Sequence, residues 1–414
     1  MPNGGTPGRA GAVALVAAFL VVHVGLALVN VLATAYNPAG DVTGVYRFWI
    51  DHWRQTGVLV GVDTAWVYPI GALPPMLAAS VLGDGAYLWT WLGIVTVLDA
   101  AALWLLARRR RSLAWWWLGS TALLGPVALS RIDAIALPIA IAGVLLVATR
   151  PWLASLLFTL AAWVKVWPAA LVAAMLLALK RVSGAVTAAA LASAGIIGLT
   201  VLAGGGGAVF SFLTAQADRG LQVEAPVAIP WLWSAALGDP GVQVYYDTTI
   251  LTYQLRGAGV AAVAGAMNPV LLVGVAAVVA LALVARARGA APLPLVAVTG
   301  LALVSAVIAL NKVGSPQYLT WYVAPILLGL LVDARRFRGV SIAVLVAAGL
   351  TQLVYPWWYA GVVVPEPAAI AVLTLRNAIE VGLLGWALVA LASLRAPAEP
   401  GADARPASPS VAAR

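Results

Sequence analysis

The chain has 414 residues, of which 63% are hydrophobic and only 9% are charged, whereas soluble domains carry about 25% charged residues. This composition excludes an ordinary soluble protein. The formal charge of +9 does not indicate a nucleic-acid partner, because the basic residues lie in short clusters between apolar runs. The sequence contains no cysteine, which excludes disulfides, thiol catalysis and thiolate metal sites.

Apolar runs longer than about 18 residues, the length of a membrane-spanning helix, recur along the chain. They include residues 11–32, 87–107, 184–202 and 261–285. We interpret the first run as an uncleaved helix, because it is long and no convincing cleavage pattern follows it. We predict an all-α, polytopic transmembrane bundle over residues 1–395 and a disordered cytoplasmic tail over residues 396–414, which are rich in Pro, Ala and Ser.

The basic clusters between the runs predict the orientation, because basic loops stay in the cytoplasm. The clusters are Arg108 to Arg111, Arg150, Lys180 with Arg181, Arg286 with Arg288, Arg335 with Arg336 and Arg338, and Arg395. They are consistent with about twelve spans if residues 151–179 form a hairpin of two short helices that meet near Lys165. A single long tilted helix is the alternative for this segment. The other polar segments then fall on the outer face.

The first outer segment places Asp41 just beyond the first span, where a solvated loop aspartate is the alternative to a functional one. Residues 46–54 predict an amphipathic helix along the membrane surface, with Phe48, Trp49 and Trp53 at headgroup depth. The stretch from Trp66 onward is broken by prolines and indicates either a re-entrant segment beside a cavity or an interfacial anchor.

Several lone charges lie outside the basic clusters. Arg131 and Asp133 are held at the membrane boundary, where they bind substrate or form a mutual or cross-loop ion pair that only orients helices. Lys165 lies between two tryptophans, and a lysine there suggests an anionic partner such as a phosphate.

The later outer segments add further donors and acceptors. Arg219 is placed to bind phosphate, while Gln222 and Glu224 are placed to bond hydroxyls, although a surface turn is the alternative. Lys312 is a second lone lysine. In the last run, Arg376 and Glu380 lie one helical turn apart and predict a structural ion pair.

Taken together, these segments resemble the GT-C superfamily of membrane glycosyltransferases, and most closely glycosyltransferase family 87. The residues that carry the resemblance are Asp41 with Tyr46, Tyr68-Pro69, Lys165-Val166-Trp167-Pro168, Arg219-Gly220-Leu221-Gln222-Val223-Glu224, Asn311-Lys312-Val313 and Ser315-Pro316-Gln317-Tyr318. Each motif is short, and only their order over most of the membrane domain is specific.

The resemblance implies a multi-pass plasma-membrane enzyme that moves a hexose, mannose in particular, from a polyprenyl-phosphate sugar to a lipid-linked or glycan acceptor at the extracytoplasmic face. Asp41 would be the general base, and Lys165, Arg219 and Lys312 would bind the donor phosphate. The other substrate-binding residues would be Tyr46, Tyr68, Arg131, Asp133, Gln222, Glu224, Asn311, Gln317 and Tyr318. No cofactor is expected. Val42 and Thr43 follow Asp41 where some relatives have a second acidic residue, which weakens the case for an obligate metal.

A transporter or flippase for a polyprenyl-linked or polar lipid is the alternative, since it would also combine many helices with lone charges. It ranks second because no internal repeat is evident and the charges gather at one membrane face. A noncatalytic assembly subunit is a third possibility, and it would not depend on Asp41.

Overall fold

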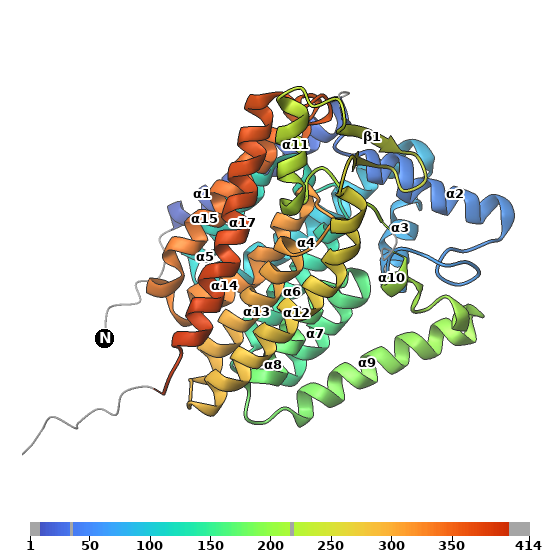
Figure 1. The fold of residues 1–414 in the computed structure, drawn as a ribbon. Coiled ribbons are helices and arrows are strands. Elements are labelled where there is room, and N and C mark those ends of the chain that lie inside the picture. Colours follow the sequence, from blue (N-terminus) through green and yellow to red (C-terminus); the bar gives the residue numbers. More distant parts are fainter. Residues whose placement is uncertain (1–8, 34–35, 216–218, 397–414) are drawn as a thin grey trace, which may run out of the picture.

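The computed structural model describes residues 9–33, 36–215 and 219–396, which form a bundle of helices with one small hairpin of strands (Figure 1). Within these ranges, seven helical segments are long and apolar enough to cross a membrane. Their helices are α1 (Arg9–Leu32), α4 (Tyr87–Arg109), α9 (Ser183–Leu202), α12 (Val260–Ala287), α13 (Pro292–Ala309), α15 (Ala334–Gln352) and α17 (Pro367–Ser393). The prediction of a helical membrane protein is therefore confirmed.

The remaining helices are shorter. They are α2 (Arg47–Thr56), α3 (Leu73–Ala79), α5 (Arg111–Leu124), α6 (Asp133–Leu146), α7 (Pro151–Val164), α8 (Ala169–Ala178), α10 (Ser211–Thr214), α11 (Ile229–Ala236), α14 (Val323–Val332) and α16 (Ala360–Val363). Several of them are apolar but fall short of a full crossing. A count of about twelve spans therefore stays a prediction. Apart from Ala396, the predicted tail lies outside the described residues.

Residues 151–179 form two helices, α7 and α8, as the hairpin alternative predicts. The chain leaves the helical conformation at Lys165, which is extended with φ −149° and ψ 130°. Pro168 follows three residues later, and a proline disfavours helical backbone at the residue before it. The break brings Lys165 to the tip of the hairpin.

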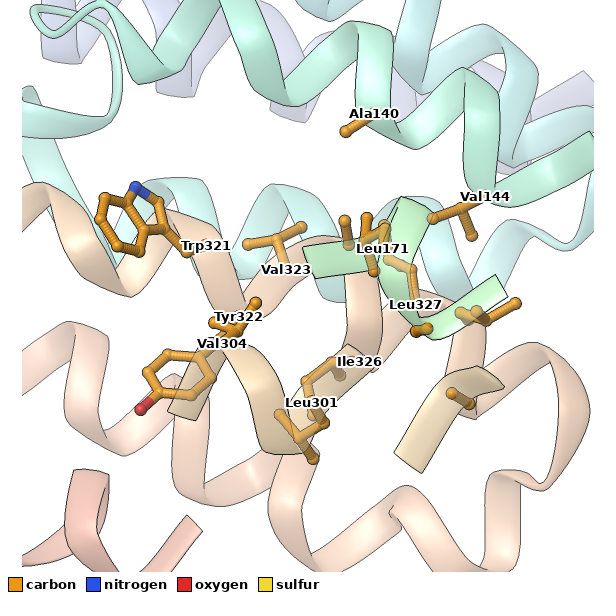
Figure 2. Packing of buried hydrophobic residues seen from close by; sticks show 14 of the residues in the cluster. Ala140, Val144, Leu171, Leu301, Val304, Trp321, Tyr322, Val323, Ile326 and Leu327 are labelled. Carbon is orange, nitrogen blue, oxygen red and sulfur yellow. The ribbon is translucent and has the colours of Figure 1, made fainter. Parts of the chain in front are cut away.

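Helix α13 forms the centre of the bundle, because 78% of its apolar window is buried, compared with 11% for α9. It packs against α8, α12, α14 and α17. Figure 2 shows part of this core, in which Leu301 and Val304 of α13 belong to one buried cluster with Leu171 of α8 and Ile326 of α14. In Figure 1, α9 runs away from the bundle at the lower right; it packs on α7 and leaves most of its surface uncovered.

The basic clusters gather at one end of the bundle and bond the last carbonyls of helices. Arg110 donates from Nη1 to the Leu330 carbonyl of α14 at 3.0 Å, and Arg286 donates to the Leu177 carbonyl of α8 at 3.0 Å. Arg336 likewise donates to the Ala390 carbonyl near the end of α17 at 3.0 Å. The last carbonyls of a helix have no partner within the helix, so these arginines satisfy them while marking one end of the molecule.

The polar connecting segments gather elsewhere, and they include a hairpin that the all-α prediction missed. Its strands, β1 (Gln243–Asp247) and β2 (Thr252–Arg256), pair antiparallel with Tyr246 opposite Tyr253. In Figure 1, β1, α11 and α2 all lie in the upper part of the view. The hairpin is small, but it forms one wall of the cavity described next.

Candidate active site

A cavity of about 390 Å³ lies among the polar connecting segments. Its walls come from the turn after α1, the residues before α3, the tip of the α7–α8 hairpin, the β-hairpin, and the connections before α14 and α16. The predicted site residues that line it are Asp41, Tyr68, Arg131, Lys165, Arg219, Gln222, Glu224, Gln317 and Tyr318. Segments far apart in the sequence thus bring most of the predicted side chains to one space.

Asp41 begins a helical turn of the π type, Asp41–Tyr46, that leads directly into α2. The helix predicted over residues 46–54 is therefore present, while its position along the membrane surface stays a prediction. Phe48 is 60% exposed, whereas Trp49 packs edge to face against Trp66 at 5.2 Å and Tyr68 at 5.8 Å and lines the cavity. A hydrogen bond from the Ile132 amide to the Tyr46 hydroxyl, at 3.0 Å, fixes the end of this turn.

Arg131 and Asp41 form an ion pair across two connecting segments, with 3.3 Å between Nε and Oδ2. The Arg131 side chain is 7% exposed, whereas that of Asp41 is 33% exposed. The cross-loop pairing that the sequence left open is therefore present. Burying a charge without partners costs free energy. The contacts of the Arg131 guanidinium therefore stabilise it in its buried position.

The other contacts of Arg131 fix the backbone before Asp41. One guanidinium nitrogen donates to the Pro38 and Ser130 carbonyls, and Nη2 donates to the Tyr355 hydroxyl at 3.2 Å. The Ser130 hydroxyl also donates to the Pro38 carbonyl, at 2.8 Å. Arg131 thus joins the segment that carries Asp41 to the wall that carries Tyr355.

Lys165 reaches the cavity from the tip of the α7–α8 hairpin and stands over the Tyr68 ring, with 4.4 Å between Nζ and the ring centroid. This is the geometry of a cation–π contact. Burial lowers the pKa of Lys165, and the carboxylates of Asp133 and Asp41 act in the opposite direction. Asp133 itself is buried behind the cavity wall, where its Oδ1 accepts from the Trp321 indole at 2.6 Å.

Arg219 lines the cavity together with Lys165. Among the described residues, no carboxylate lies within 4.0 Å of either cation. Nε of Arg219 is buried, and the described part of the chain gives it no hydrogen-bond partner. These two side chains are therefore available to an anion that enters the cavity.

Glu224 also lines the cavity, but its carboxylate is bound from the other side. Oε2 lies 3.3 Å from Nη2 of Arg376, which also pairs through Nη1 with Oε1 of Glu380 at 3.2 Å. The predicted ion pair of Arg376 and Glu380 is thus confirmed and extends to a third residue. Burial raises the pKa of Glu224.

The predicted residues that do not line the cavity are Tyr46, Asp133, Asn311 and Lys312. They support its walls instead. The Asn311 side chain accepts from the Val313 amide at 3.0 Å, and the Lys312 carbonyl accepts from the Gln222 amide at 3.0 Å. Lys312 is 4% exposed and lies outside the cavity lining, and its role in binding the donor phosphate stays a prediction.

Sequence reasoning missed a set of tyrosines along one wall of the cavity: Tyr36, Tyr246, Tyr253, Tyr355 and Tyr359. A signal was present for two of them. Residues 243–247 and 252–256 are rich in Tyr, Val and Thr around a turn at Asp247 and Thr248, a pattern typical of a hairpin.

Comparison with known proteins adds one match. The model of glycosyltransferase family 87 matches residues 66–310, which is more than half of the chain. The matched range contains Tyr68, Arg131, Lys165, Arg219 and Glu224, whereas Asp41 and the segment around Lys312 lie outside it. No curated protein and no solved structure matches the chain.

Proposed function

The chain belongs to glycosyltransferase family 87 and is a membrane glycosyltransferase, and we propose that it moves mannose from a polyprenyl-phosphate sugar to a lipid-linked or glycan acceptor. One observation carries this proposal. Lys165 and Arg219 line the cavity, and among the described residues no carboxylate oxygen lies within 4.0 Å of either cation. The carboxylate of Asp41 lines the same cavity.

The two cations suit the donor phosphate. When the sugar leaves its phosphate, the bond between the anomeric carbon and the phosphate oxygen breaks and the electron pair stays on that oxygen. Positive groups that are already in place stabilise this developing charge. Lys165 supplies a point charge, and Arg219 supplies a planar fork that matches phosphate oxygens.

Asp41 suits the role of general base. It accepts the proton of the acceptor hydroxyl while the oxygen attacks the anomeric carbon. The contact with Arg131 holds one carboxylate oxygen in place, and the 33% exposure of the side chain leaves the group accessible from the cavity. Arg131 is therefore a positioning residue.

The same proposal includes the orientation in the plasma membrane. The basic end is cytoplasmic by the positive-inside rule, about twelve segments span the bilayer, and the cavity faces the extracytoplasmic side. Since nucleotide sugars are not expected there, a donor carried by a lipid fits that side.

The test is transfer from radiolabelled polyprenyl-phosphate mannose in membranes that contain either the wild-type chain or Asp41→Asn at equal levels. We expect the variant to lose about 10²- to 10⁴-fold in rate, the usual effect of general-base catalysis. Asp63→Asn is the matched control, because Asp63 accepts from the Leu59 amide in the same loop and does not line the cavity.

Equal rates for wild type and Asp41→Asn would contradict the role of Asp41. An absence of product with the wild-type chain would contradict this donor. Lipid translocation would then be measured on the same membranes, as the transporter alternative requires.

A further inference from the structure

Five tyrosines form a continuous aromatic wall on one side of the cavity, here called the tyrosine wall: Tyr36, Tyr246, Tyr253, Tyr355 and Tyr359. Tyr359 is its centre, with ring centroids 5.2 Å from Tyr36, 5.8 Å from Tyr253 and 5.1 Å from Tyr355, all edge to face. Tyr246 extends the wall from Tyr253 at 5.0 Å. The phosphate and proton steps proposed above use none of these rings.

The wall comes from three segments far apart in the sequence, and all five residues line the cavity. Tyr246 is 46% exposed, whereas Tyr359 at the centre is 8% exposed. Hydrophobic packing alone does not explain a wall of phenols on a cavity surface, because each tyrosine has an apolar ring and a polar hydroxyl. The neighbouring lining residues Gln222, Thr249 and Thr252 add hydrogen-bonding groups.

These features match a pyranose ring. A sugar has an apolar face of C–H groups, which packs on an aromatic ring, and a rim of hydroxyls, which pairs with phenol, amide and threonine groups. A polyprenyl or acyl chain would need no such polar rim.

The position of the wall decides which sugar it suits. Arg131 contacts the Tyr355 hydroxyl at 3.2 Å and Asp41 at 3.3 Å, so the wall and the proposed base are joined through one side chain. Lys165 is placed over Tyr68, which is outside the wall. A sugar on the wall would therefore present a hydroxyl to the base, which is the position of the acceptor.

We propose that the tyrosine wall binds a pyranose ring of the acceptor, so that the enzyme extends an existing glycan or glycolipid. The assignment to the acceptor rests on the proposed function; the binding of a pyranose does not. A preceding glycosyl transfer must then supply the substrate.

The test uses two amphiphilic sugars, octyl α-D-mannopyranoside and octyl β-D-glucopyranoside, with 1,2-octanediol as a probe of equal chain length without a ring. Binding is measured on the purified full chain in lipid nanodiscs, without donor. The variant is Tyr246→Ala with Tyr253→Ala. The control is Tyr245→Ala. Tyr245 directly precedes Tyr246 in β1 and does not line the cavity, and its ring centroid lies 4.4 Å from Cζ of Arg256.

We expect an octyl glycoside to bind the wild type and the control more tightly than the diol, and the double variant to bind it at least about tenfold more weakly, since aromatic contacts of this size contribute about 1.4 kcal/mol. Binding of polyprenyl-phosphate mannose, measured on the same proteins, should be unchanged.

Equal glycoside binding by the wild type and the double variant would overturn the proposal. Loss of donor binding with glycoside binding retained would also overturn it, because the wall would then serve the donor sugar. If the wild type binds donor but prefers neither glycoside to the diol, the wall proposal fails and the proposed function stands. Glycoside binding at the wall without donor binding would support a pyranose site and contradict the proposed donor.

Discussion

Arg131 and Asp41 show how a single buried cation can organise a site at the level of individual residues. Arg131 contacts the proposed base, the Pro38 and Ser130 carbonyls and the Tyr355 hydroxyl. Arginine suits this place because it stays charged and offers several donors in fixed directions. A lysine would keep the charge but not the geometry.

If Arg131 acts by positioning Asp41, the effects of removing Arg131 and of removing the Asp41 carboxylate on the activation free energy should not be additive. We expect Arg131→Gln to lower the transfer rate by about 10- to 100-fold. The double variant with Asp41→Asn should be little worse than Asp41→Asn alone, with a coupling of about 0.5–3 kcal/mol. The measurement is the transfer rate of the four proteins, normalised to the amount that stays folded. Strictly multiplicative effects would contradict the positioning role.

Lys165 predicts a pH dependence of donor binding. Burial lowers the pKa of this amine below its ordinary value of about 10.4. Lys165 is therefore fully protonated well below the lowered pKa. It loses its charge as the pH rises through that pKa, at a lower pH than an exposed lysine would. Donor affinity should fall over the same range.

The matched variant for this prediction is Lys165→Arg, because arginine stays charged. It should keep donor affinity at alkaline pH, while Lys165→Met should bind weakly at every pH. Lys180→Arg, in a basic cluster away from the cavity, should leave the wild-type profile unchanged. If Lys165→Arg follows the same pH profile as the wild type, Lys165 does not control the transition.

The residues found from the sequence and those missed differ in their chemistry. Lone charges such as Arg131 and Lys165 stand out in an apolar chain, because a membrane tolerates them only with partners or a function. Tyr355 and Tyr359 give no such signal, since tyrosine is common at any membrane interface. Lys312 was found by the same rule; it lies outside the cavity lining, and its predicted role in phosphate binding stays a prediction.

At the scale of elements, the sequence predicted individual helices better than contacts between segments. The spacing of the basic clusters predicted a hairpin of two helices over residues 151–179, and the aromatic pattern after Asp41 predicted α2. The β-hairpin was missed within a long polar segment. The segments around Glu224 and Gly314 are in contact although they are about 90 residues apart in the sequence. The hydrophobic periodicity of the sequence does not predict such a contact.

At Gly314 these two segments lie in close contact. A Cβ at this position would lie 2.5 Å from the Glu224 carbonyl oxygen, which is a backbone atom that cannot simply rotate away. Gly314→Ala should therefore shift the cavity wall and destabilise the protein by about 1–3 kcal/mol, the usual cost of overpacking. The measurement is thermal unfolding in detergent, together with the transfer rate.

Gly44→Ala is the control for that change. Gly44 lies in the turn between Asp41 and Tyr46, and a Cβ there would meet no atom within 4 Å. It should leave stability and transfer near the wild-type values. Equal behaviour of the two variants would show that the Gly314 contact does not hold the wall.

At the scale of the whole molecule, the sequence predicted a helical membrane protein and separated its basic loops from its other polar segments. It did not predict how the helices pack. A helix that is apolar on all sides is compatible with the centre of a bundle and with contact to lipid, so α13 and α9 look alike in sequence although one is mostly buried and the other mostly uncovered. Short helices such as α8 and α14 also make the number of crossings hard to count, because burial in protein replaces part of the length that lipid would require.

The sidedness of the two ends can be tested directly, because the chain contains no cysteine and any introduced thiol is the only one. Thr248 lies exposed in the turn of the β-hairpin beside the cavity, and Ser112 lies exposed in the basic cluster after α4. On intact cells, a membrane-impermeant maleimide should label Thr248→Cys and should label Ser112→Cys only after permeabilisation, because basic loops stay in the cytoplasm. The reverse pattern would place the cavity in the cytoplasm, where nucleotide sugars are available, and would remove the main reason to expect a lipid-borne donor. Labelling of both residues on intact cells would contradict the assignment of the two ends to opposite sides of the membrane.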